Sequence, residues 1–135
     1  MLCSLTLHGN RLRGTIPEFL AVNMTKLEFL DLSNNNFKGV LTAPWSSMPS
    51  IKSLRISRAT GGLGGTFPTF HAVQHLEELD LSYNTFSGTI PPNFLAGVTS
   101  KDREVTVRLT LNDLTGKVPE SLGKFQRLIL NQCFH

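Results

Sequence analysis

The sequence predicts an α/β-type solenoid, a right-handed superhelix of stacked repeats with a concave parallel β-sheet. Three observations lead to this prediction. Similar segments recur about every 25 residues along the chain. Within a segment, apolar residues stand at spacings of three and two, as at Leu76, Leu79 and Leu81. Most segments then close on a glycine followed by an apolar residue and proline, as in residues 88–91.

Residues 76–92 are the clearest copy of the repeated unit. Leu79 and Leu81 alternate with polar neighbours, so a short strand directs its apolar side chains to one face. Asn84 comes where the strand must turn, and its amide can bond the backbone of a neighbouring turn. Gly88 frees the backbone, and Pro91 fixes φ and ends strand pairing. Each unit therefore predicts a strand, a turn and a return segment.

Aligned on the opening apolar position, the chain reads as five repeats and a partial sixth. The repeats start near Leu2, Leu27, Ile51, Leu76, Glu104 and Phe125. Successive starts are 25, 24, 25, 28 and 21 residues apart, within the range of this class of repeat. We therefore predict one domain over residues 1–135. We also expect it to be a fragment that lacks both end caps.

The first three repeats differ in how closely they follow the template. Repeat one matches it throughout, and repeat two has Thr42 where others have proline. Repeat three has Ala59 at the asparagine position, and its glycine-rich stretch 61–65 predicts a two-residue insertion before Phe67. We expect the turn to bulge there, with the backbone groups left by the missing asparagine bonded to water or to the glycine loop.

The last three repeats carry the other departures. Repeat four is followed by a charged segment at 101–104, which we expect to be exposed. Repeat five has Glu104 at a position that is normally apolar, and in repeat six Cys133 replaces the asparagine. Strands about 4.8 Å apart would separate Cys3 from Cys133 by about 24 Å. A disulfide needs Cα atoms within about 7 Å, so we predict that these two cysteines do not pair.

Composition excludes several classes of function. The chain has 135 residues, 40% hydrophobic and 17% charged, with a net charge of +3. Its basic residues form no run, which argues against nucleic acid as a partner. No apolar stretch approaches the roughly 18 residues of a membrane span, so we predict no span in this chain. Residues 1–7 lack the features of a signal peptide and are typical of a first strand.

The repeat resembles the plant-type leucine-rich repeat. The resemblance rests on the consensus Leu-x-x-Leu-x-Leu-x-x-Asn-x-Leu-x-Gly-x-Ile-Pro, whose last part stands at residues 14–17, 88–91 and 116–119. It covers nearly the whole chain. Members occur in ectodomains of receptor-like kinases and receptor-like proteins, in polygalacturonase-inhibiting proteins, and in algal and protist surface proteins. The resemblance implies a curved solenoid with a second short strand or 3₁₀ turn beyond the concave sheet. The family's cysteine-bearing caps and any kinase domain are missing from this chain.

The concave sheet is the predicted recognition surface. The alignment puts Thr6, Asp31, Arg55, Asp80 and Arg108 in one column, with Ser4, Phe29, Ser53, Glu78, Thr106 and Arg127 beside it. Aromatic and arginine side chains among carboxylates are typical binding anchors. The predicted partner-binding residues are Phe29, Asp31, Arg55, Arg58, Glu78, Asp80, Tyr83 and Arg108. The alternative is that Asp31, Arg55, Asp80 and Arg108 only neutralise one another, as exposed pairs worth about 0–1 kcal/mol each.

Three further motifs have competing interpretations. The glycines at 61–65 lack the Gly-Lys-Ser/Thr of a phosphate-binding loop, which favours an insertion turn. His71 and His75 could share a zinc ion on a helix, but no third ligand is evident, which favours a surface pair. Asn23 opens the sequon Asn-Met-Thr and is a predicted glycosylation site if the parent protein is secreted.

No catalytic constellation is present in the sequence, because no serine stands in a Gly-x-Ser-x-Gly turn and no nucleophile has an identifiable base. We predict a non-enzymatic module without cofactor or metal that binds a peptide, protein or glycan. The resemblance implies part of a receptor-like or secreted surface protein, extracellular or at the cell surface if its parent has a signal peptide. The alternatives are a secreted inhibitor of cell-wall-degrading enzymes and a purely structural segment. Uncapped ends also predict self-association.

Overall fold

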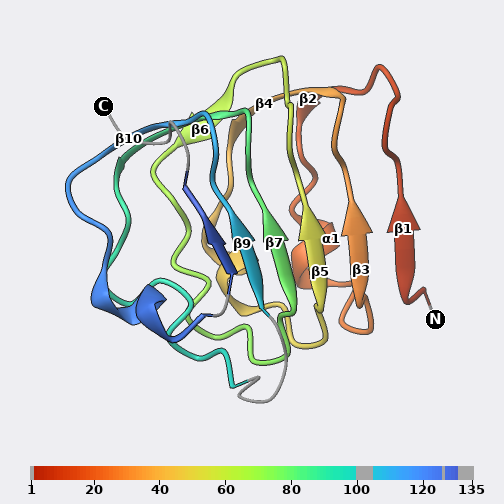
Figure 1. The fold of residues 1–135 in the computed structure, drawn as a ribbon. Helices are drawn as coiled ribbons and strands as arrows, with labels where there is room; N and C mark the ends of the chain where they lie inside the picture. Colours follow the sequence, from red (N-terminus) through yellow and green to blue (C-terminus); the bar gives the residue numbers. More distant parts are fainter. Residues whose placement is uncertain (1, 100–104, 126, 131–135) are drawn as a thin grey trace.

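A computed structural model describes residues 2–99, 105–125 and 127–130. These residues form two parallel sheets, as the repeat pattern predicts (Figure 1). The concave sheet has the order β1-β3-β5-β7-β9-β11, and one strand comes from each successive repeat. Its strands are β1 Ser4–Thr6, β3 Phe29–Asp31, β5 Ser53–Arg55, β7 Glu78–Asp80, β9 Thr106–Arg108 and β11 Arg127–Ile129.

The second sheet lies behind the first and has the order β10-β8-β6-β4-β2 (Figure 1). Its strands are β2 Arg13–Thr15, β4 Asn36–Val40, β6 Leu63–Gly65, β8 Thr85–Thr89 and β10 Asp113–Thr115. Within the described residues, the return segments contain one turn of α-helix and two 3₁₀ turns, namely α1 Phe19–Val22, η1 Ala43–Ser47 and η2 Glu120–Lys124. The concave strand and a second strand therefore recur in the order that the resemblance implies, and a helical turn follows them in repeats one, two and five.

The core is filled by equivalent residues from successive repeats. Leu54 and Leu79 pair in register in the concave sheet, and both are fully buried. Behind them Phe67 stacks on Phe86 with ring centroids 4.8 Å apart, and Phe94 lies 5.6 Å from Phe67. Such aromatic contacts add to the free energy gained by burying the rings. The interior is thus a continuous column, shared by neighbouring repeats rather than enclosed within one.

Repeat three contains the predicted two-residue insertion, and the strand register locates it. Successive partners are 25, 24, 25 and 28 positions apart in the concave sheet, but 23, 24, 21 and 26 apart in the second. Between repeats one and two, and between repeats four and five, the spacing in the second sheet is two residues shorter than in the concave sheet. Between repeats two and three the two spacings are equal, and between repeats three and four the second-sheet spacing is four residues shorter. Two extra residues between Ala59 and Leu63 account for the change.

In repeats two, four and five a buried asparagine ties the turn to the one before it. The amide of Asn84 donates to the carbonyls of Ile56 (2.6 Å) and Leu81 (2.9 Å), and its oxygen accepts the Ala59 N–H at 3.0 Å. Asn84 therefore bonds the backbone of repeat three, a partner that our expectation of water or the glycine loop did not include. The Gly62 N–H closes the turn by donating to the Ala59 carbonyl at 3.3 Å.

The charged segment at 101–104 and Cys133 lie outside the described residues, so the expectations for them are not addressed by the structure. Among the described residues, no helix has the length and apolarity to cross a membrane.

Candidate functional site

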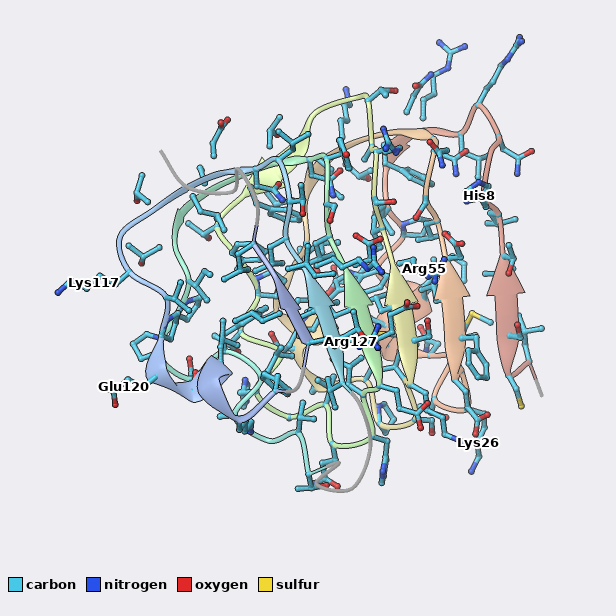
Figure 2. The ribbon with its side chains drawn as sticks, viewed as in Figure 1. His8, Lys26, Arg55, Lys117, Glu120 and Arg127 are labelled. Carbon is cyan, nitrogen blue, oxygen red and sulfur yellow. The ribbon has the colours of Figure 1, made fainter. Side chains whose placement is uncertain are left out.

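The register of the concave sheet aligns the outward side chains in columns. Asp31 pairs with Arg55, Arg55 with Asp80, and Asp80 with Arg108. The predicted residues of the neighbouring column, Phe29 and Glu78, stand at the first position of β3 and β7. This agrees with the alignment of the repeats. Arg55 lies near the middle of the sheet (Figure 2).

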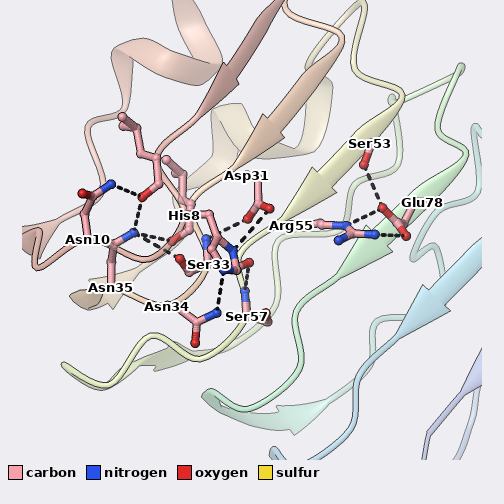
Figure 3. A network of polar contacts seen from close by, with 12 residues as sticks. His8, Asn10, Asp31, Ser33, Asn34, Asn35, Ser53, Arg55, Ser57 and Glu78 are labelled. Carbon is pink, nitrogen blue, oxygen red and sulfur yellow. Dashed lines mark hydrogen bonds and ion pairs between the residues drawn. The ribbon is translucent and has the colours of Figure 1, made fainter.

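Arg55 pairs with Glu78 rather than with the aspartates in its own column. Its Nε lies 2.7 Å from Glu78 Oε1 and its Nη2 lies 2.9 Å from Oε2, while the Ser53 hydroxyl donates to Oε1 at 2.9 Å (Figure 3). The hydrogen bond from Arg55 lowers the pKa of the Glu78 carboxyl, and the Glu78 carboxylate raises the pKa of Arg55. The alternating ladder Asp31-Arg55-Asp80-Arg108 is therefore wrong as a scheme of ion pairs for Arg55. The longer glutamate reaches the guanidinium diagonally across the strands.

This pair gives a prediction for the pH dependence of stability. Because Arg55 lowers the pKa of Glu78 in the folded chain, the stabilisation is present above the ordinary glutamate pKa of about 4.3 and is lost as pH falls through the lower folded value. We expect Glu78→Gln to cost about 0.5–1 kcal/mol at pH 7, since the pair is partly exposed, and almost nothing at about pH 2. Urea unfolding at both pH values measures the difference. Glu18→Gln, at an exposed position, is the control, and a penalty that persists unchanged in acid would contradict the prediction.

A polar network orients Asp31 at the end of β3, the second strand of the concave sheet. One oxygen of Asp31 accepts the Ser33 N–H at 2.9 Å, and the other lies 3.6 Å from His8 Nδ1 (Figure 3). His8 Nε2 is 3.3 Å from the amide nitrogen of Asn34. The hydroxyl of Ser33 accepts the Ser57 N–H at 3.0 Å. Asp31 is thus held in place by backbone and side chains of repeats one and two.

Residues just beyond the concave strands adopt a left-handed backbone. In repeats two to five they are Asn34, Arg58, Tyr83 and Leu111, with φ between 55° and 59°. This conformation is uncommon for residues other than glycine, and it turns these side chains outward at the ends of the strands. The guanidinium carbon of Arg58 lies 3.8 Å from the centre of the Tyr83 ring, a cation–π contact between adjacent repeats.

Four of the eight predicted residues meet around one pocket of about 280 Å³. They are Arg58, Asp80, Tyr83 and Arg108. Hydroxyl side chains complete the lining, from Ser57, Ser82 and Thr110. These hydroxyl residues were not predicted as binding residues, although a serine or threonine directly after the second core residue of the strand recurs in repeats two to five and was a signal for them. Phe29 stands apart from the pocket, with 46% of its surface exposed.

The other sequence candidates lie elsewhere. His71 and His75 are exposed in a turn and a bend rather than a helix, so helical spacing does not bring them together. Within the described ranges, no group of three histidine, cysteine or acidic side chains is placed to hold a metal ion. Asn23 is exposed directly after α1, and its backbone N–H donates to the Phe19 carbonyl at 2.8 Å. Its glycosylation stays a prediction.

These features define a class of protein, a parallel-β solenoid that presents ordered rows of side chains on one exposed sheet. The chain belongs to the Leucine Rich Repeat family, in its plant-type form. The family's sequence profile matches residues 1–23, 26–48 and 75–96, about half of the chain. Those ranges correspond to repeats one, two and four. The profile passes over repeat three, where the two extra residues lie.

Curated relatives come from Arabidopsis thaliana. Receptor-like protein 39 is 34% identical over 122 residues, which cover 88% of this chain and 13% of the relative. The calmodulin-binding receptor kinase CaMRLK is 36% identical over 124 residues, which cover 90% of this chain and 18% of the kinase. The chain therefore spans less than a fifth of the length of these relatives.

Solved structures of plant receptors share the fold. A TDR receptor superposes with a TM-score of 0.83 and 28% identity, over 98% of this chain and 23% of that one. The Arabidopsis HAESA ectodomain, solved with an extended IDA peptide hormone, has a TM-score of 0.77 and 28% identity, over 93% of this chain and 20% of the ectodomain.

Proposed function

We propose that this chain is a non-catalytic recognition module of a receptor-like surface protein, which binds a peptide or protein ligand on its concave sheet. The observation that carries this proposal is the cluster of charged and aromatic side chains on β3, β5, β7 and β9 and just beyond them. The cluster consists of Phe29, Asp31, Arg55, Arg58, Glu78, Asp80, Tyr83 and Arg108, which we call the recognition patch.

Binding would work through rigid presentation. The apolar halves of the strands are fixed in the core, with Leu30, Leu54 and Leu79 at most 1% exposed. Several polar side chains of the patch are already held by hydrogen bonds, as in the pair Arg55–Glu78. A ligand would therefore meet ordered side chains, and less conformational entropy would be lost on binding. The related HAESA ectodomain was solved with a bound peptide hormone, and a peptide ligand for this chain would be consistent with that.

A double substitution, Arg55→Ala with Tyr83→Ala, tests the recognition patch. Peptides would first be selected from a phage-displayed random library against the purified wild-type chain. We expect the double variant to bind them at least about 30-fold more weakly, since truncated anchors of this kind cost about 2 kcal/mol or more. Titration calorimetry would measure the dissociation constants.

The matched control removes two exposed side chains from the second sheet, by Arg13→Ala with Lys38→Ala. Its affinity should equal that of the wild type, and circular dichroism should be the same for all three chains. Selected peptides that bind the patch variant as tightly as the wild type would overturn the proposal. A selection that enriches no peptide over an empty surface would favour a purely structural segment.

A further inference from the structure

The outward face of α1 is apolar, which the stacking of the repeats does not require. Leu20 and Ala21 of this helix are buried in the core. Phe19 and Val22 are not buried with them, and 54% and 49% of their surfaces are exposed. Single exposed apolar residues are common, but two on one helical turn form a patch that another group can cover. We call Phe19 and Val22 the α1 patch.

The predicted glycosylation acceptor Asn23 lies one helical turn after Phe19. Its backbone keeps α-helical angles, with φ −100° and ψ −23°, and its N–H donates to the Phe19 carbonyl at 2.8 Å. Residues four apart on a helix lie on the same face, with Cβ atoms about 5–6 Å apart. The first group attached to the Asn23 side chain would therefore stand beside the α1 patch.

The sequon is open to a modifying enzyme. Asn23 and Thr25 are exposed and lie in turns that follow α1. Among the described residues, the Asn23 side chain makes no hydrogen bond, so its amide nitrogen is available. The Thr25 carbonyl accepts the Ser50 hydroxyl at 2.7 Å, which holds the turn against the following repeat. The acceptor is thus presented by an ordered turn rather than packed against the protein.

We propose that Asn23 carries an N-linked glycan whose first sugar lies on the ring of Phe19. N-acetylglucosamine has a face of C–H groups and a polar rim, so it can cover an aromatic ring while its hydroxyls stay in water. The sequence predicts the acceptor, and the structure adds the surface that holds the sugar. Because α1 lies behind the concave sheet, the glycan leaves the recognition patch open (Figure 1).

The inference rests on the proposed function, because N-glycans are attached to proteins that enter the secretory pathway. The donor is an oligosaccharide linked to a lipid through pyrophosphate. A bond forms between Nδ2 of Asn23 and the anomeric carbon of the first sugar, and the bond from that carbon to the pyrophosphate oxygen breaks. The lipid pyrophosphate leaves, and the amide nitrogen loses one proton.

NMR of the glycosylated chain tests the contact directly. The full chain, preceded by a cleavable signal peptide, would be secreted from a eukaryotic cell line and trimmed with an endoglycosidase to one sugar on Asn23. We expect the proton signals of that sugar to be displaced by the ring current of Phe19 and to show cross-relaxation with its ring protons. Both effects should be absent in Phe19→Ala and present in Phe19→Tyr, which keeps an aromatic ring.

Thermal unfolding provides a second measurement through a double-mutant cycle. We expect the single sugar to raise the unfolding midpoint of the wild type by about 2–4 °C relative to Asn23→Gln, and by no more than about 1 °C in the Phe19→Ala background. Val118→Ala, at an exposed apolar position in repeat five, is the matched control and should keep the full shift.

Three results would overturn the proposal. They are a secreted chain whose mass shows Asn23 unmodified, a wild-type sugar without ring-current displacement, and an equal sugar-dependent shift with and without the Phe19 ring. If the unmodified chain self-associates and Phe19→Ala abolishes this while the sugar shows no contact, a second copy covers the α1 patch instead. In each case, selected peptides that still depend on Arg55 and Tyr83 would leave the recognition function standing.

Discussion

Gly61→Ala is expected to destabilise the fold by about 2–4 kcal/mol, because the added methyl has no room in the insertion turn. A Cβ at this position would lie 2.6 Å from the carbonyl oxygen of Phe37 and closer still to that of Asn36. Both obstacles are backbone atoms of β4, so no side-chain rotation can relieve the overlap. The insertion turn passes directly against repeat two, and only glycine fits there.

The neighbouring glycine provides the matched control. At Gly62 nothing lies within 4 Å of the position that an alanine methyl would occupy, but φ is +96°, so alanine would suffer backbone strain without steric overlap. We expect Gly62→Ala to cost about 1–2 kcal/mol. Gly123→Ala, where the surroundings are open and φ is not positive, should be close to neutral. Urea unfolding of the three variants measures the order of their stability losses. A Gly61→Ala chain as stable as Gly123→Ala would show that the turn does not touch β4.

Asn84→Ala is expected to cost about 3 kcal/mol, because it removes three buried hydrogen bonds, two of which join repeats three and four. The Ala59 N–H and the Ile56 carbonyl would lose their partner inside the turn, and an unsatisfied buried group costs about 1–3 kcal/mol. We expect the unfolding midpoint to fall and exchange of the Ala59 amide proton to become faster. Hydrogen exchange followed by NMR would measure this locally.

Asn10 is the natural control, since it occupies the same motif position in repeat one. It is exposed, and its amide donates to the Leu7 carbonyl at 2.8 Å. Water can replace that partner, so Asn10→Ala should cost no more than about 1 kcal/mol. Equal losses for the two variants would mean that the asparagine acts within its own turn rather than between repeats.

Much of the fold could be predicted from the repeat because the strand period is two. If Leu79 and Leu81 face the core, then Glu78 and Asp80 must face outward, and every later repeat inherits the same register. The insertion in repeat three was equally visible, since extra residues must leave the sheet. What the pattern could not show is that Gly61, and not Gly62, lies against the backbone of β4.

The candidate site, too, was predicted in part from the sequence and decided in part by the tertiary structure. Sequence alone placed the recognition patch on one surface, because alternation assigns each residue a face and a column. Only the tertiary structure decided that Arg55 binds Glu78, that Arg58 lies on Tyr83, and that no described carboxylate oxygen lies within 4.0 Å of the Arg108 guanidinium. The physical reason is that a long side chain on a sheet can reach either its direct cross-strand neighbour or a diagonal one. Which of these partners is contacted depends on side-chain length, on backbone φ and on the distances across strands, and the sequence pattern does not give these.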